Sequence, residues 1–132
     1  AFVEQAILEH DLRGARILLV EDTPFNVLFA TQLLEGWNAE VEVAENGRIA
    51  VEKMRFQAYD LVLMDLQMPE MDGYTATRKI REFNAHTPII ALTASASTDV
   101  RDKITDCGMQ DYVTKPFNPD DLFLRLRKSI PR

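Results

Sequence analysis

Three acidic side chains stand at positions where they could bind a metal ion. Glu21 and Asp22 follow an apolar run typical of a β-strand, and Asp65 ends another such run, LVLMD. Because ligands of an open parallel sheet bind outside the carboxyl ends of the strands, we expect these acids to meet there. Three adjacent carboxylates repel one another unless a cation lies among them. Oxygen ligands without histidine or cysteine favour Mg²⁺, with Mn²⁺ as a substitute.

A hydroxyl and an ammonium group are expected at the same end of the sheet. Thr93 ends the apolar run IIALT, and Lys115 follows the short run DYVT. Taken alone, Thr93 could cap the next helix and Lys115 could be a surface cation. Beside a metal-binding carboxylate, however, a hydroxyl and a positive charge are what a transferred phosphoryl group requires. The five groups together predict a site for phosphoryl chemistry.

The elements that must position these residues alternate between short apolar runs and longer amphipathic stretches. This alternation predicts an α/β fold, a doubly wound five-stranded parallel sheet flanked by five helices. The third and fourth strands are uniformly apolar, which suits the centre of a sheet, whereas the alternating charges of EVEV suit an edge. Expected strands are residues 16–21, 40–44, 61–65, 89–93 and 112–114, and expected helices are 23–36, 48–55, 75–83, 99–106 and 120–130.

The first helix is expected to carry more apolar surface than a sheet can cover. It should begin with Thr23 as its cap and Pro24 in its first turn, and end at Gly36. Packing on a sheet requires one apolar stripe, and this helix has two. Either neighbouring helices cover both stripes, or the second contacts a partner. One stripe consists of Val27, Ala30 and Leu34, and the other of Phe25, Phe29 and Leu33.

Composition narrows the class of protein. The 132 residues, 46% apolar and 27% charged, fit one compact domain. A net charge of -6 argues against binding to nucleic acid. The apolar runs are too short for a membrane span and no signal peptide is visible, so we expect a cytoplasmic chain without membrane contact. The single cysteine, Cys107, precedes Gly108 at an expected helix end and is interpreted as a small buried residue.

The motifs closely resemble, over roughly residues 15–130, the receiver domain of response regulators and hybrid histidine kinases. The acidic pair lies in LLVEDTPFN, the acceptor aspartate in LVLMDLQMPEMDG, the threonine in IIALTAS and the lysine in DYVTKPF. The resemblance implies the flavodoxin-like, receiver type of fold. It also implies phosphorelay signalling, in which Asp65 accepts a phosphoryl group from a phosphohistidine and the domain then switches conformation or passes the group to a histidine phosphotransfer domain. Such a domain catalyses its own phosphorylation and dephosphorylation and is not a conventional turnover enzyme.

The resemblance assigns roles within the site. Asp22 and Asp65 would bind Mg²⁺ directly, Glu21 would bind it through water, and the backbone carbonyl of Gln67 would complete the protein ligands. Lys115 would pair with Asp65 and later with the phosphoryl group.

Conformational roles follow from the same resemblance. Thr93 would move toward the phosphoryl group, and Tyr112 would turn into the space that it leaves. The peptide bond before Pro116 would be cis, and Gly73 would permit the turn after the loop that follows the acceptor aspartate.

The implied partners are a histidine kinase, a histidine phosphotransfer domain, or both. Asn26 after VED, the pair Asn46-Gly47 and the stretch MPEMDGYTATRKIR favour the receiver of a hybrid kinase over a free-standing regulator. The partner's helices would dock against the acid site and the first helix. The residues expected at this docking surface are Asn26, Phe29, Met68, Pro69 and Pro116.

Residues 1–14 stand outside the strand and helix alternation, so we expect a linker or N-terminal extension there and the receiver domain over residues 15–132. The sequence His10-Asp11-Leu12-Arg13 weakly resembles the phosphoaccepting histidine box of sensor kinases. The strand that begins at Arg16 leaves no room for the helical hairpin that such a histidine requires. A solvated linker is therefore favoured.

Two other classes of protein share parts of the pattern. A phosphatase of the haloacid-dehalogenase class needs a second aspartate two positions after the first, and Gln67 stands there. A flavodoxin-like binding module needs a phosphate loop rich in serine, threonine and glycine after the first strand. The acids Glu21 and Asp22 at that position would repel a flavin phosphate.

Overall fold

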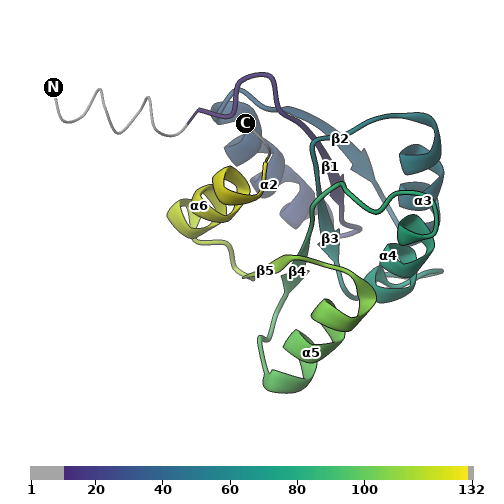
Figure 1. Cartoon of the computed structure of the whole chain (residues 1–132). Helices are drawn as coiled ribbons and strands as arrows, with labels where there is room; N and C mark the ends of the chain where they lie inside the picture. The colour runs from purple at the N-terminus through teal and green to yellow at the C-terminus, as the bar shows by residue number, and fades with distance from the viewer. Residues whose placement is uncertain (1–10, 131–132) are drawn as a thin grey trace, which may run out of the picture.

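Strands and helices alternate throughout residues 11–130, the part of the chain that the computed structural model describes (Figure 1). All the expected elements are present, and their ends differ from the expected ones by at most two residues. The strands are β1 (Arg16–Val20), β2 (Glu40–Ala44), β3 (Leu61–Asp65), β4 (Ile89–Thr93) and β5 (Asp111–Thr114). The helices are α2 (Pro24–Gly36), α3 (Gly47–Phe56), α4 (Gly73–Arg81), α5 (Thr98–Cys107) and α6 (Pro119–Ser129).

The sheet is parallel throughout, in the order β2-β1-β3-β4-β5. β3 and β4 are buried along their whole length, and β2 lies at an edge, as the apolar and alternating patterns predicted. The chain places β2 on one side of β1 and β3 on the other. This reversal of strand order creates a crevice beyond the carboxyl ends of β1 and β3, where ligands of doubly wound sheets bind.

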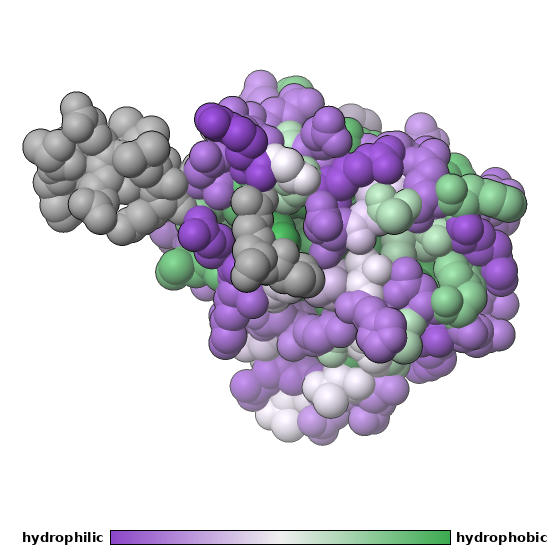
Figure 2. All heavy atoms as spheres, turned by 45° about the horizontal axis from the view of Figure 1, so that its top comes forward, coloured by the Kyte–Doolittle hydropathy of each residue, from purple (hydrophilic) through white to green (hydrophobic). Residues whose placement is uncertain are grey.

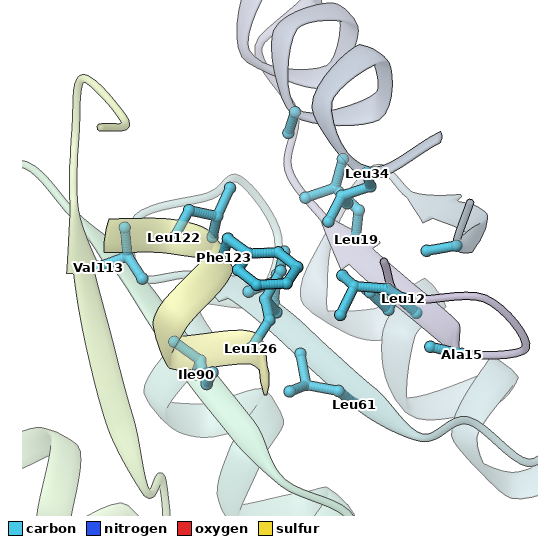
Figure 3. Close-up of a cluster of buried hydrophobic side chains, with 14 of the residues drawn as sticks. Leu12, Ala15, Leu19, Leu34, Leu61, Ile90, Val113, Leu122, Phe123 and Leu126 are labelled. Atoms are coloured by element: carbon cyan, nitrogen blue, oxygen red, sulfur yellow. The ribbon is translucent and has the colours of Figure 1, made fainter. Parts of the chain in front are cut away.

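Two apolar clusters hold helices against the two faces of the sheet. On one face, α2 and α6 pack over β-strand side chains, as Figure 3 shows for Leu34, Leu122 and Leu126. On the other face, α3, α4 and α5 contribute side chains such as Met54 and Ile80. Full burial of each large apolar side chain contributes roughly 1.5–3 kcal/mol. The site beyond the strand ends is therefore built on a framework packed from both sides.

Packing on the first face begins before the expected domain boundary at Ala15. Leu12 is fully buried in the cluster of Figure 3, and its N–H donates a hydrogen bond to the carbonyl of Trp37 at 2.6 Å. The weak histidine box includes His10, which lies outside the described residues, as does the rest of the expected N-terminal extension up to that position.

Helix α2 begins and ends where the sequence predicted, but its cap differs. Thr23 occupies the cap position, but its side chain makes no capping hydrogen bond; its backbone N–H donates to the carboxylate of Glu21 at 3.3 Å. In the second apolar stripe, Phe29 and Leu33 pack against the core cluster, whereas Phe25 is 72% exposed. Neighbouring elements therefore cover the second stripe only in part.

Caps explain where two other helices begin and end. The Asp72 carboxylate accepts the Thr75 N–H at 2.8 Å, so α4 begins two residues earlier than expected. Gly108 ends α5 in the left-handed conformation, with φ of 105°, and Cys107 is buried, as predicted.

The surface is largely hydrophilic on the face that Figure 2 presents, which brings the top of Figure 1 forward. Among residues 11–130, no helix combines the length and the apolar character that crossing a membrane requires.

Candidate functional site

The three acids predicted to converge do so beyond β1 and β3. In the parallel register Val20 pairs with Met64, so Glu21 lies level with Asp65 at the strand ends. Carboxylate oxygens of Glu21, Asp22 and Asp65 all lie within 4.8 Å of one another. Glu21 and Asp65 are buried, at 1% and 5% exposure, whereas Asp22 is exposed to solvent. The cluster is thus walled by protein on one side and open on the other.

Lys115 reaches these acids from the far side of β4. Its N–H donates to the Thr93 carbonyl at 2.8 Å, which continues the pairing of β4 and β5 past the last strand residue. Its ammonium nitrogen lies 3.1 Å from Asp65 Oδ1 and 3.1 Å from Glu21 Oε2. The pairing with Asp65 was expected, and the pairing with Glu21 was not. The peptide bond between Lys115 and Pro116 is cis, as the resemblance implied.

Negative charge is in excess at the site. Burial and the neighbouring Glu21 carboxylate raise the pKa of Asp65 despite its hydrogen bond from Lys115. Burial alone would lower the pKa of Lys115, but its hydrogen bonds to Asp65 and Glu21 outweigh burial and raise it. One ammonium group therefore does not neutralise three carboxylates. A divalent cation with oxygen ligands fits this donor set.

Two of the acids, Asp22 and Asp65, line a cleft of about 390 Å³. Gln67 lines this cleft, and its N–H points toward Asp65 Oδ1 at 3.4 Å. Apolar and aromatic side chains line the cleft as well. They include Tyr74, Leu92, Ala94 and Val100.

The Thr93 hydroxyl lies in the cleft but is engaged locally. Its Oγ1 donates to the Ser95 carbonyl at 2.7 Å and accepts the Ser95 N–H at 3.2 Å. Ser97, not Thr93, caps α5 by accepting the Val100 N–H at 3.3 Å. The alternative that Thr93 merely caps the following helix is therefore wrong.

Asn26 is a site residue whose main contact the sequence did not reveal. Its side-chain amide donates to Glu21 Oε1 at 3.3 Å, on the oxygen that also accepts the Thr23 N–H. Since Lys115 binds the other oxygen, both oxygens of the Glu21 carboxylate are held. The signal for this contact was available, because a residue in the first turn of a helix faces the strand end that precedes it.

The acceptor loop, residues 66–72, closes tightly behind Asp65. The Gly73 N–H donates to the Leu66 carbonyl at 3.1 Å, and a Cβ at Gly73 would lie 2.2 Å from the Asp65 carbonyl oxygen. Gly73 is therefore needed for close approach of the backbone, not for an unusual turn conformation. The positive φ in this loop, 67°, belongs to Glu70. Of the two loop residues expected at the docking surface, Met68 is half-buried and Pro69 is exposed.

Tyr112 lies outside the wall of the cleft and packs against the second core cluster. The Arg125 guanidinium lies over its ring, 5.0 Å from the ring centre. Arg125 is held in turn by Asp111 and Asp121. Turning of the Tyr112 ring would therefore break a cation–π contact.

An aromatic row runs from α2 toward the segment after Lys115. The rings of Phe25 and Phe29 are stacked with centres 6.3 Å apart, and Phe29 is stacked on Phe117 at 6.0 Å. Pro116, which precedes Phe117, is exposed. Phe29 and Pro116, both expected at a docking surface, thus lie along one side of the acid site.

Comparison with known proteins agrees with this arrangement. The family model of the response regulator receiver domain matches residues 17–127. The sensor protein GacS of Pseudomonas syringae pv. syringae is 44% identical over 115 residues, an alignment that covers 83% of this chain. The chain spans only 13% of the length of GacS.

Two solved structures show the same likeness over nearly the whole fold. The receiver domain of sensor histidine kinase PA1611 from Pseudomonas aeruginosa PAO1, with a magnesium ion coordinated in its active site cleft, is 40% identical with a TM-score of 0.83, covering 88% of this chain and 97% of that one. A co-crystal structure of the Saccharomyces cerevisiae histidine phosphotransfer protein Ypd1 and the receiver domain of Ssk1 matches at 31% identity and a TM-score of 0.83, covering 87% and 88% of the two chains. The chain therefore belongs to the response regulator receiver family and is a receiver domain of two-component phosphorelay signalling.

Proposed function

We propose that Asp65 is the residue that accepts the phosphoryl group, and that this chain does so with bound Mg²⁺. The observation that carries the proposal is the contact of Lys115 with both Asp65 and Glu21 in a cluster that still has excess negative charge. Asp22 and Asp65 would hold the ion directly, Glu21 through a water molecule, and Gln67 through its backbone carbonyl. Mn²⁺, which also prefers oxygen ligands, would substitute.

The chain's own residues supply the remaining chemistry. A carboxylate oxygen of Asp65 attacks the phosphorus, the bond to the donor imidazole nitrogen breaks, and its electron pair stays on that nitrogen. The Lys115 ammonium compensates charge on the transferred group, and the Thr93 hydroxyl leaves the Ser95 carbonyl to donate to a phosphoryl oxygen. When bound, Mg²⁺ supplies further positive charge, which favours the ionised form of Asp65.

Conformational switching would follow from that movement of Thr93. The space it leaves would admit the Tyr112 ring, which now lies under the Arg125 guanidinium. Ring resonances of Tyr112 recorded with and without beryllofluoride test this step. An unchanged ring environment would exclude it.

The phosphoryl donor would be a protein histidine on a histidine kinase or a phosphotransfer domain. The surface expected to meet it is the exposed side of α2 at the aromatic row, where Phe25 is 72% and the neighbouring Leu28 is 58% exposed. Support comes from the matched Ssk1 receiver domain, which was solved together with a histidine phosphotransfer protein. The net charge of -6 supports protein partners over nucleic acid. A cytoplasmic setting, as part of a hybrid sensor kinase similar to GacS, is the context we propose.

Docking is tested by Phe25→Glu, with Phe56→Glu as its matched control. Phe56 is 83% exposed but ends α3, away from the aromatic row. Phe25→Glu, like a charge at Phe29, should slow transfer from a phosphorylated phosphotransfer domain and leave labelling by acetyl phosphate unchanged. Equal transfer by Phe25→Glu and the wild type would exclude this surface.

The central experiment is phosphorylation by acetyl phosphate, followed by intact mass. The wild type should gain one phosphoryl group with Mg²⁺ and none with EDTA, and Asp65→Asn should gain none in either condition. A phosphoryl adduct on Asp65→Asn would place the acceptor elsewhere. If the wild type takes no phosphoryl group under any condition, the domain would act only as a docking module.

A further inference from the structure

Side chains at the start of α3 hold the acceptor loop, although the proposed transfer does not use them. The Asn46 side-chain amide donates to Glu70 Oε2 at 3.1 Å, and Arg48 Nε lies 3.6 Å from the same oxygen. The other end of the Asn46 amide, Oδ1, caps α3 by accepting the Ile49 N–H at 2.9 Å. Asn46 therefore links a helix end to the loop that follows Asp65.

Glu70 holds a backbone conformation that a side chain disfavours. Its φ is 67°, and the Met71 N–H donates to the Pro69 carbonyl at 2.7 Å across it. A three-residue turn closed in this way around a positive φ is a rare and strained γ-turn. Glycine would adopt this conformation with less strain. In this conformation the carboxylate of Glu70 contacts Asn46 and Arg48 at the start of α3.

The backbone of the loop touches α3 as well. A Cβ at Gly47 would lie 2.6 Å from the Met71 carbonyl oxygen and 3.0 Å from the Ala76 Cβ. Such close approach brings the start of α3 directly onto the loop, one residue from Glu70. The loop is thus held by a side-chain hydrogen bond and by backbone contact at neighbouring positions.

We propose that Asn46 and Glu70 are positioning residues that fix the acceptor loop, and through it Gln67, beside Asp65. Gln67 lies two residues after Asp65 and three before Glu70, and its N–H points toward Asp65 Oδ1. When Glu70 is released from Asn46, the peptide groups between Gln67 and Glu70 can rotate. The proposed Mg²⁺ site, which includes the Gln67 carbonyl, then loses its preset geometry. This inference rests on the proposed function of Asp65.

Three variants separate the positioning contact from the helix cap. Asn46→Ser keeps an oxygen that can cap α3 but is too short to donate to Glu70. Glu70→Gly removes the carboxylate and relieves the strain, whereas Glu70→Gln keeps an oxygen that accepts from Asn46. Glu52→Ala is the matched control, because Glu52 also binds Arg48, at 3.3 Å, but lies within α3.

The first measurement is amide hydrogen exchange in metal-free protein. Asn46→Ser and Glu70→Gly should exchange the N–H groups of Met71 and Gly73 roughly tenfold faster, and Glu70→Gln and Glu52→Ala should match the wild type. Hydrogen exchange in the double variant Asn46→Ser/Glu70→Gly should be no faster than in either single variant, because each substitution alone already removes the same Asn46–Glu70 contact. Unchanged exchange in Asn46→Ser would overturn the proposal, and so would faster exchange along the whole of α3.

The second measurement is Mg²⁺ affinity, followed by NMR titration. Loss of the positioning contact should weaken binding roughly tenfold, as removal of groups that orient metal ligands does. Affinity that is unchanged while loop exchange rises would overturn the link to the metal site. Because hydrogen exchange requires neither metal nor phosphodonor, a wild type that cannot be phosphorylated would refute the function without deciding the loop contact.

Discussion

Two charge clusters lie toward opposite ends of the sheet, and they differ in their balance of positive and negative charge. The distal cluster, Arg16, Glu42, Lys53 and Tyr59, surrounds one carboxylate with two cations and a phenol. Glu42 Oε2 accepts Lys53 Nζ at 2.7 Å and the Tyr59 hydroxyl at 2.6 Å, and Glu42 Oε1 lies 3.5 Å from Arg16. The acid cluster, Glu21, Asp22, Asp65 and Lys115, has three carboxylates and one cation, and that cation contacts Glu21 and Asp65.

The pKa directions differ accordingly. Hydrogen bonds from Lys53 and Tyr59 lower the pKa of Glu42, whereas burial and Glu21 raise the pKa of Asp65. Burial and the Glu42 carboxylate also raise the pKa of Tyr59, so its hydroxyl stays a donor. A cluster in which the ionised form of the carboxylate is favoured stabilises the fold. A cluster in which that form is disfavoured is suited to receive a cation or a phosphoryl group.

The largest contrast is expected between the two lysines. Lys115→Met should slow phosphorylation by acetyl phosphate roughly a hundredfold or more, because it removes the ammonium group that compensates charge on the transferred group. Lys53→Met should leave the rate unchanged, since Lys53 binds only the distal cluster. Initial rates from intact mass measure both. Equal rates for the two variants would mean that the acid cluster does not carry the reaction.

The next contrast concerns stabilisation by the cation. Mg²⁺ at a hundred times its dissociation constant should stabilise the wild type by about 2.7 kcal/mol. Asp22→Asn should lose most of this gain because it removes an exposed ligand, and Glu35→Gln at the far end of α2 should keep it. Urea unfolding with Mg²⁺ and with EDTA measures the gain. A full gain in Asp22→Asn would exclude Asp22 as a ligand.

Neutral substitutions should change stability in opposite directions at the two clusters. Glu42→Gln should destabilise the protein by about 1–2 kcal/mol near neutral pH, because charge-assisted hydrogen bonds are lost. Asp65→Asn, measured in EDTA, should stabilise it, because like-charge repulsion and the cost of a buried charge are relieved. Urea unfolding of both variants beside the wild type gives the two signs, and a common sign would refute the comparison.

The pH dependence of these differences should also be opposite. The lowered pKa of Glu42 contributes stability that is present above its ordinary pKa and is lost as pH falls through the folded value. The raised pKa of Asp65 opposes folding at neutral pH, and this opposition is relieved as pH falls through the folded value. In acid, the stability lost in Glu42→Gln and the stability gained in Asp65→Asn should therefore both become smaller.

The smallest expected effect is that of Tyr59→Phe. The substitution removes the hydroxyl that donates to Glu42 and lies 2.9 Å from Gln57 Oε1, and should cost about 1 kcal/mol of stability. Phosphorylation should be unaffected, because the distal cluster does not contact the acid site. Thermal unfolding with an acetyl phosphate assay tests both, and slower phosphorylation would show that the clusters are coupled.

The sequence predicted the parts of the molecule that follow from periodicity and strand ends. Buried parallel strands are uniformly apolar, so β3 and β4 were placed to the residue, and acids at the ends of neighbouring strands had to meet. Loop conformations and side-chain rotamers have no such period. The local pairing of Thr93 with Ser95 and the positive φ of Glu70 therefore have no signal in the sequence.

The single tryptophan of the chain provides an optical signal that is separate from the chemistry of the domain. Trp37 directly follows α2, whose thirteen residues span about 20 Å from the end beside the acid cluster. Its indole meets the Phe123 ring edge-on at 5.2 Å, where α2 and α6 adjoin. Its fluorescence should therefore report separation of these two helices and not occupancy of the acid cluster. Unfolding of the metal-free, metal-bound and phosphorylated forms can thus be compared on one common baseline.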